Sequence, residues 1–384
     1  MTRFTRDPWD PRSLQGPAVA VVLLALLASA TSLANGFAYD DRWIIVDNPN
    51  VHDLAHWWNV FGETYWPATR NAALYRPLTI LAYQLQWAIG GTDPLLFHTV
   101  NVILYAAVSA MVLLVAAEVM PFAAAWVAAA LFAVHPVHVE AVGNVVGQAE
   151  LWSSLTTLGA LLAYLRGRRD GQRISRERGL IIAALYFGGM LFKENAIVLP
   201  ALLAAAEAFL VVDDRPWRER LDAFVTLGVW LTLLAAIVLG VRVLVTGEIG
   251  GDVEHPALRT LDMRERAWVM LAIAPEFARL LLWPARLYAD YSPQMVPVLT
   301  SPSPGHANGA LLVLCLIVLA IVSAKRFPLA TFALAWLAVT AAPTANILIP
   351  TGILLAERTL FLPSVGVMMV VAAVVPWCLA QLRS

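Results

Sequence analysis

The sequence of 384 residues is poor in charge: 14% of its residues are Asp, Glu, Lys or Arg, whereas 60% are hydrophobic. Soluble globular proteins carry about 25% charged and about 45–50% apolar residues, so this composition excludes a soluble enzyme and a disordered scaffold. The two cysteines, Cys315 and Cys378, lie in apolar runs without metal-ligand spacing, which excludes a secreted module held together by disulfides. A net charge of −1 provides no electrostatic basis for binding nucleic acid.

The sequence does contain a series of long apolar runs. Several reach 18 residues or more, which is enough for a helix to cross about 30 Å of hydrocarbon. We therefore predict an all-α polytopic membrane protein, integral and multi-pass, with about ten transmembrane helices. The expected spans are 17–37, 96–118, 121–139, 146–165, 179–193, 195–212, 222–245, 309–324, 328–345 and 359–381. Two further apolar stretches, 77–90 and 267–283, are interrupted by polar residues, and we expect them to lie as helices at the outer interface.

Basic residues indicate which side of the membrane each loop faces, because Lys and Arg are enriched in short cytoplasmic loops. With a cytoplasmic N-terminus, the inner segments hold Arg3, Arg6, Arg12, the run 166–178, Arg215, Arg218, Arg220, Lys325, Arg326 and Arg383. Two long loops, about 38–95 and 246–308, then face outside, so the active site is expected on the extracytoplasmic side. The first span is expected to remain as an uncleaved anchor, although Ala28-Ser29-Ala30 could pass for a signal-peptidase site.

Two adjacent carboxylates, Asp40 and Asp41, open the first long outer loop. Carboxylates near a bilayer are costly and usually functional, and repulsion within such a pair raises the pKa of one member toward that of a useful base. We expect Asp40 or Asp41 to accept a proton from an acceptor hydroxyl while its neighbour holds Arg42 or a sugar hydroxyl. The alternative interpretation is a helix end with solvated charges.

Several cations are expected on the same surface. Arg76 stands before a proline at a helix start, which suits a phosphate, although a lipid head group could equally attract it. Lys193 lies in a tight outer turn, where it could meet a phosphate with Glu194 orienting it, or form a self-contained pair with Glu194. Arg358 at the outer start of the last span is a further candidate anion ligand. The acidic residues expected beside these cations are Glu140, Asp290 and Glu357.

His135, His138 and Glu140 end the third expected span on the outer side. Three such residues could suggest a metal, but Pro136 breaks the helix between the histidines and no Asp or Cys set completes a tetrahedral site. Structural hydrogen bonding or positioning of an acceptor is favoured, with no metal and no cofactor required. A transporter or flippase would place its polar groups near the mid-bilayer on broken helices, so the gathering of these groups at one face favours catalysis there.

An ordered set of motifs carries a family resemblance. The motifs are Tyr39-Asp40-Asp41-Arg42, Tyr75-Arg76-Pro77-Leu78, His135 to Val142, Lys193-Glu194, Ala289-Asp290-Tyr291-Ser292 and Ala356-Glu357-Arg358. Across about residues 36–366, the sequence resembles the membrane portion of the transmembrane and TPR-repeat-containing (TMTC-type) protein O-mannosyltransferases, which are related to the GT-C glycosyltransferases. The resemblance implies one GT-C-like transmembrane domain over residues 1–384.

The resemblance also implies a polyprenyl-phosphate sugar as donor, with mannose as the sugar. Our hypothesis for the mechanism is inverting transfer of that sugar to an acceptor hydroxyl. The resemblance places the acidic pair needed for activity at Asp40 and Asp41. The residues expected to bind the donor phosphate or substrate are Arg42, Arg76, His135, His138, Glu140, Lys193, Glu194, Asp290, Glu357 and Arg358.

The sequence departs from the family in two places. It reads Val-Gly-Gln-Ala-Glu at 146–150, where the family has a basic residue in Val-Gly-Arg-Ala-Asp, and it shows no TPR domain before Ser384. The acceptor, a protein Ser or Thr or a glycan, therefore stays open, and a TPR-containing partner could supply the repeats. A polyprenyl-linked polysaccharide polymerase or ligase is the alternative enzyme, and a lipid-linked sugar flippase is the alternative without catalysis.

Overall fold

The computed structural model describes residues 11–67, 74–248, 250, 256–291, 296–351 and 353–381. Helices and turns make up these residues, with no β-strand among them, so the prediction of a helical polytopic membrane protein is confirmed. Residues that served in the sequence analysis but lie outside the described part are Arg3, Arg6, Ser292 and Arg383.

A helix lies on each of the ten ranges expected to span the membrane. These helices are α1 (Pro11–Ser29), α4 (Pro94–Val119), α5 (Phe122–Ala133), α7 (Gln148–Gly167), α8 (Arg176–Phe192), α9 (Leu199–Phe209), α10 (Trp217–Thr246), α13 (Pro304–Ser323), α14 (Pro328–Ala341) and α15 (Phe361–Gln381).

Fewer than ten of them are long and apolar enough to cross a membrane. The described residues contain five such stretches: Gln15–Ala34, Pro94–Val119, Arg218–Thr246, Pro304–Ser323 and Glu357–Val374. A sixth is formed if α5 and the segment Pro136–Gly143, which meet at a bend of 50°, count as one broken span. The total of ten spans, and the GT-C-like arrangement, therefore stay predictions.

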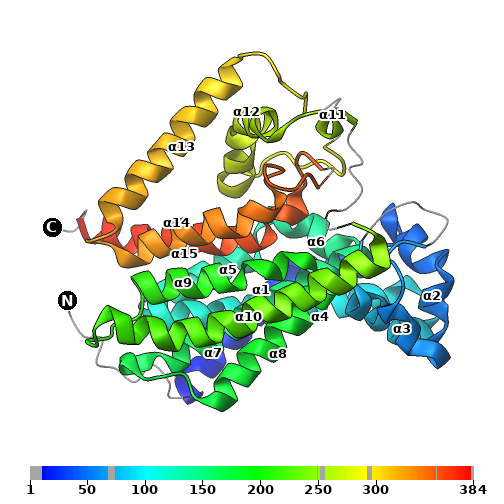
Figure 1. The fold of residues 1–384 in the computed structure, drawn as a ribbon, viewed down its shortest axis with the longest axis horizontal. Coiled ribbons are helices and arrows are strands. Elements are labelled where there is room, and N and C mark those ends of the chain that lie inside the picture. Colours follow the sequence, from blue (N-terminus) through cyan, green and yellow to red (C-terminus); the bar gives the residue numbers. More distant parts are fainter. Residues whose placement is uncertain are drawn as a thin grey trace.

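Helix α4 forms the centre of the bundle and packs against α1, α5 and α7, while α15 packs against α5 and α14 (Figure 1). The contact face of α5 is built from small residues, and Ala124, Ala125, Ala128 and Ala129 are all buried. Small side chains allow helices to approach closely, which is the usual basis of helix packing in a membrane.

The two long loops carry their own helices. The first loop contains α2 (Pro49–His52), η3 (Leu54–Phe61) and α3 (Pro77–Gly90), and the second contains α11 (Pro256–Arg259) and α12 (Met263–Leu282). Figure 1 shows α2 and α3 together at one end of the bundle. The helices expected at 77–90 and 267–283 are thus present. Pro77 occupies the first turn of α3, a position where a missing backbone N–H costs nothing, and this start places Arg76 just before the helix.

Candidate functional site

The two members of the acidic pair have different environments. The Asp41 side chain is fully buried, and its carboxylate accepts hydrogen bonds from the backbone N–H groups of Ala38 at 3.1 Å, Val145 at 3.3 Å and Val146 at 2.9 Å. Burial raises the pKa of Asp41 to about 6, against the lowering effect of those hydrogen bonds. Asp41 therefore connects the start of the first long loop to the turn that precedes α7.

Asp40 is partly exposed. Within the described part of the chain its carboxylate has neither a hydrogen-bond donor nor an ion-pair partner. Arg42 is exposed and likewise has no carboxylate partner among the described residues, so the expected pairing of Arg42 with Asp40 or Asp41 is not formed. Of the two carboxylates, Asp40 is the one that an incoming substrate can reach.

Arg76 forms a two-point ion pair with Glu194. Its Nε donates to Oε2 of Glu194 at 2.9 Å and its second terminal nitrogen donates to Oε1 at 2.5 Å. The guanidinium lies 5.0 Å from the centre of the Tyr65 ring, which is favourable for a cation over an aromatic face. Burial would raise the pKa of Glu194, but the charge of Arg76 holds it well below its usual range.

Tyr65 connects this pair electrostatically with the acidic pair. Burial raises the pKa of the Tyr65 hydroxyl to about 12, Arg76 acts to lower it, and Asp40 and Asp41 act to raise it. Tyr65 also packs in one buried cluster with Ile44, close to the acidic pair in the chain, and with Val145, whose backbone N–H binds Asp41. The first long loop therefore brings the acidic pair and Arg76 to one part of the fold.

Lys193 is paired with Glu150, not with its neighbour Glu194. The Lys193 Nζ lies 2.5 Å from Oε2 of Glu150, and Asn195 donates to the same oxygen at 3.3 Å. Both partners of the ion pair are buried. The expectation that Glu194 orients Lys193 is wrong, because Glu194 binds Arg76. Glu150 was not among the expected site residues, and a carboxylate in the first turn of an apolar helix is the signal that could have identified it.

Arg242 was not among the expected site residues, yet it belongs to this group. It is buried near the C-terminal end of α10, donates to the carbonyl of Gly250 at 2.6 Å, and its charge acts on Glu194. A single arginine inside a long apolar run was the signal that could have identified it. We name Arg76, Lys193, Arg242, Glu150 and Glu194 the basic cluster.

Three further expected site residues form contacts between segments that are distant in the chain: Glu140, Glu357 and Arg358. Arg358 binds Glu140 through its side chain at 3.0 Å and through its backbone N–H at 2.8 Å. Glu357 accepts hydrogen bonds from the Tyr288 backbone at 3.0 Å and the Tyr291 hydroxyl at 2.6 Å. These contacts join η9 (Glu357–Leu360) to α6 (Val139–Gly143) and to the second outer loop.

The two histidines also have structural partners. His138 is buried and lies 2.9 Å from both the Tyr105 hydroxyl and the Ser364 hydroxyl. His135 contacts the Leu281 carbonyl at 3.1 Å. Asp290 is exposed, with no ion-pair partner in the ranges described. Across the same ranges, no three His, Cys, Asp or Glu side chains are grouped so that they could hold a metal ion.

Comparison with known proteins finds relatives that are named protein O-mannosyl-transferases. No family model matches the chain, and no solved structure matches it. Protein O-mannosyl-transferase TMTC3 of Mus musculus is 28% identical over 369 residues, covering 89% of this chain and 40% of the relative. Protein O-mannosyl-transferase Tmtc2 of Drosophila melanogaster is 31% identical over 290 residues, covering 72% of this chain and 30% of the relative.

A third relative agrees with these two. Protein O-mannosyl-transferase TMTC1 of Homo sapiens is 38% identical over 166 residues, covering 40% of this chain and 19% of the relative. The chain spans at most about 40% of the length of these relatives. The chain is a homologue of the TMTC-type protein O-mannosyltransferases and is similar to the membrane portion of these longer proteins.

Proposed function

We propose that this chain is a membrane glycosyltransferase that moves mannose from a polyprenyl-phosphate donor to an acceptor hydroxyl at the outer membrane face. The observation that carries the proposal is the partly exposed Asp40 carboxylate, which lacks a partner among the described residues and adjoins Asp41, whose three backbone hydrogen bonds hold this end of the loop. The names of the relatives, all protein O-mannosyl-transferases, support this activity.

The proposed reaction is a direct displacement with inversion at the anomeric carbon. Asp40 accepts the proton of the acceptor hydroxyl as the oxygen attacks the sugar, and general-base catalysis of this kind contributes about 10²–10⁴-fold. The bond between the anomeric carbon and the phosphate oxygen breaks, and the lipid phosphate leaves with the electron pair. Buried Asp41 acts as a positioning residue because its three hydrogen bonds hold the loop that carries Asp40.

The leaving phosphate gains negative charge, which a cationic site would stabilise. Arg76 and Lys193 suit this role, because both belong to the partly buried basic cluster, where Glu194 and Glu150 hold their charged groups in place. Arg358 and Glu357 connect η9 to α6 and to the second long loop, so we assign them to holding these segments together. No step in this scheme uses a metal or a further cofactor.

The acceptor is proposed to be a Ser or Thr hydroxyl of a protein, from the names of the relatives. The decisive experiment supplies the purified chain in lipid nanodiscs with polyprenyl phosphate mannose and scores transfer to a peptide and, separately, to a glycan. Transfer to the peptide by the native chain, and its loss in Asp40→Asn, is the expected result. Transfer to the glycan alone would indicate a polymerase or ligase. Movement of the donor across a bilayer without any transfer would indicate a flippase and would overturn the proposal.

A further inference from the structure

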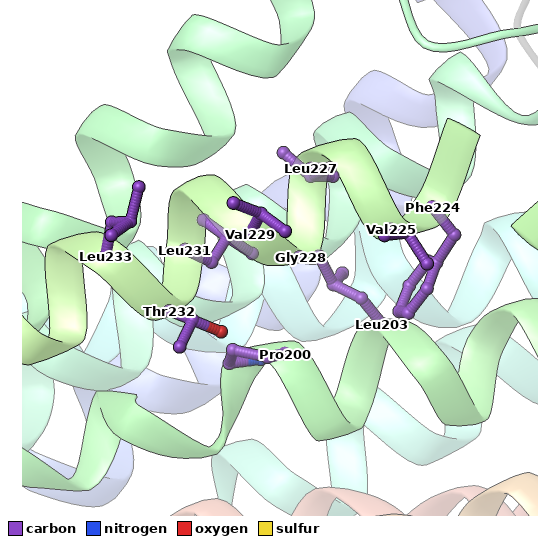
Figure 2. Close-up of a pocket in the computed structure, with 10 residues that line it drawn as sticks. All are labelled: Pro200, Leu203, Phe224, Val225, Leu227, Gly228, Val229, Leu231, Thr232 and Leu233. Carbon is purple, nitrogen blue, oxygen red and sulfur yellow. The ribbon is translucent and has the colours of Figure 1, made fainter. Parts of the chain in front are cut away.

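The groove between α9 and α10 and the buried start of α7 differ in polarity. The groove has a volume of about 440 Å³, and of the ten residues drawn in Figure 2, Thr232 is the one with a polar side chain. At the start of α7, by contrast, the amide side chains of Gln86, Asn101 and Gln148 are buried together. Buried amides are costly unless they are hydrogen-bonded, so their contacts indicate which segments they hold in place.

The three amides form a hydrogen-bonded chain from α3 to the turn before α7. Gln86 of α3 and Gln148 of α7 donate to each other, at 2.7 and 3.2 Å. Gln148 also donates to Asn101 of α4 at 2.9 Å. Asn101 in turn donates to the backbone carbonyl of Asn144 at 2.8 Å. The amide chain therefore ends on the carbonyl side of the turn at 142–147.

A second contact joins α3 to the same turn. The Tyr83 hydroxyl donates to the Val145 carbonyl at 3.3 Å, while the backbone N–H groups of Val145 and Val146 bind the Asp41 carboxylate. The turn is tightly packed, because a Cβ built on Gly147 would lie 2.1 Å from a backbone carbonyl oxygen of α6. The second half of α3 is thus attached, through this turn, to the acidic pair.

The first turn of α3 is attached to the basic cluster. Arg76, just before the helix, binds Glu194, and the Thr79 hydroxyl donates to the Phe192 carbonyl at 2.7 Å. Both contacts are with the turn between α8 and α9, which also carries Lys193. A helix is a rigid element with a fixed rise of about 1.5 Å per residue. Helix α3 therefore connects the two halves of the candidate site at a defined spacing.

We propose that α3 is a rigid spacer that sets the distance between Asp40 and the cations Arg76 and Lys193. Tyr83 and Gln86 are then positioning residues, because they attach α3 to the turn that holds the acidic pair. The proposal rests on the proposed function for the roles of the base and the cations. In an inverting displacement, the attacking hydroxyl and the leaving phosphate lie on opposite sides of the anomeric carbon. A misplacement of about 1 Å can cost about 10²-fold in rate.

The test compares two buried amides on one helix. Gln86→Met removes the amide that reaches Gln148. Gln84→Met removes a buried amide that instead donates to the carbonyls of Asn50 and Asp53 in the first long loop. Methionine has a helix propensity close to that of glutamine, so both variants are expected to fold. Because each variant loses the hydrogen bonds of one buried amide, similar losses of stability are expected in thermal unfolding.

Kinetics distinguish positioning from stability. Gln86→Met should lower kcat for mannose transfer about tenfold or more and leave the KM for polyprenyl phosphate mannose unchanged, because the cations that bind the donor keep their places. Tyr83→Phe keeps the ring and removes the hydroxyl, and it should have the same effect. Gln84→Met should keep both constants close to the native values. An equal fall of kcat in the two methionine variants, or a rise of KM in place of the fall in kcat, would overturn the proposal.

Hydrogen exchange separates this inference from the proposed function. In the purified chain in nanodiscs, the backbone N–H groups of Val145 and Val146 should exchange about tenfold faster in Tyr83→Phe/Gln86→Met than in Gln84→Met, because the turn opens more readily. If this difference is found but the native chain transfers no sugar, the proposed function fails while the attachment of α3 to the turn stands. If the native chain transfers sugar and the exchange rates are equal, the spacer assignment fails alone.

Discussion

Arg76 and Glu194 lie 118 residues apart in the chain and form a two-point ion pair with distances of 2.9 and 2.5 Å. The contact joins the first outer loop to the turn between α8 and α9. It also places the Arg76 guanidinium over Tyr65, which packs in one buried cluster with Ile44, four residues after Asp40. This one pair therefore links the candidate base to the basic cluster.

Replacing Arg76 and replacing Glu194 should affect donor binding in opposite ways. Arg76→Gln leaves Glu194 without its main partner and lowers the net charge of the cluster, so stability and donor affinity should both fall. Glu194→Gln should lower stability but preserve or improve donor affinity, because the net charge of the cluster rises. Each change should cost about 1–3 kcal/mol of unfolding free energy, the usual cost of leaving a buried polar group unpaired. Thermal unfolding in detergent and the KM for the donor measure the two effects, and a parallel loss of affinity in both variants would contradict the phosphate role.

Lys193→Ala should impair donor use far more than a change on the inner side. Losing one electrostatic contact to a transition state costs about 2.7–4 kcal/mol, or roughly 10²–10³ in kcat. Arg173 is exposed in the basic run assigned to the cytoplasmic side, so Arg173→Ala serves as the control. The double variant Lys193→Ala/Glu150→Gln should recover stability without recovering transfer. Equal effects of Lys193→Ala and Arg173→Ala on kcat/KM would count against the assignment.

Asp41 should make stability depend on pH. Burial raises the pKa of this carboxyl from its ordinary value of 3.8 to about 6 in the folded chain. The folded state therefore holds its proton more tightly, and unfolding free energy should fall as pH rises from about 4 to about 6, then level off. The fall should be on the order of 2–3 kcal/mol from the size of the shift. Unfolding measured across this pH range should show the fall in the native chain and in Asp40→Asn, and lose it in Asp41→Asn. An unchanged profile in Asp41→Asn would show that this carboxyl is not responsible.

A membrane-impermeant thiol reagent can test which side of the membrane each loop faces. In a background carrying Cys315→Ser and Cys378→Ser, Glu63→Cys in the first long loop should react in right-side-out vesicles and Arg173→Cys in inverted ones. Both positions are exposed, so the bilayer alone decides access. The opposite pattern would place Asp40 and Asp41 on the cytoplasmic side and remove the basis for chemistry at the outer face.

The sequence allowed the helices to be located because a chain in hydrocarbon must satisfy its backbone hydrogen bonds within each segment. Long apolar runs therefore coincide with α4, α10 and α13. Proline at 77 likewise marked the start of α3. The number of membrane crossings was harder to predict from the sequence. Helix α5 is only 12 residues long, and the chain bends after it, near His135, into a separate segment.

The pairing of charges could not be read from the sequence. Adjacent Lys193 and Glu194 suggested one local pair, but the fold brings Glu150 and Arg76 to them from α7 and the first loop. The burial of Asp41 could not be predicted from the sequence either. It depends on the backbone at 145–146, which the fold brings against the Asp41 carboxylate. Such choices depend on tertiary contacts between distant segments, which local patterns do not encode.

The most direct test of Asp40 as the catalytic base is the variant Asp40→Asn in the purified chain. The measurement is a single-turnover assay of mannose transfer from polyprenyl phosphate mannose to a peptide, with donor binding followed in the same sample. Transfer is expected to fall by about 10²–10⁴-fold, while donor binding and thermal stability stay close to native values. Transfer at the native rate by Asp40→Asn would show that this carboxylate is not the base.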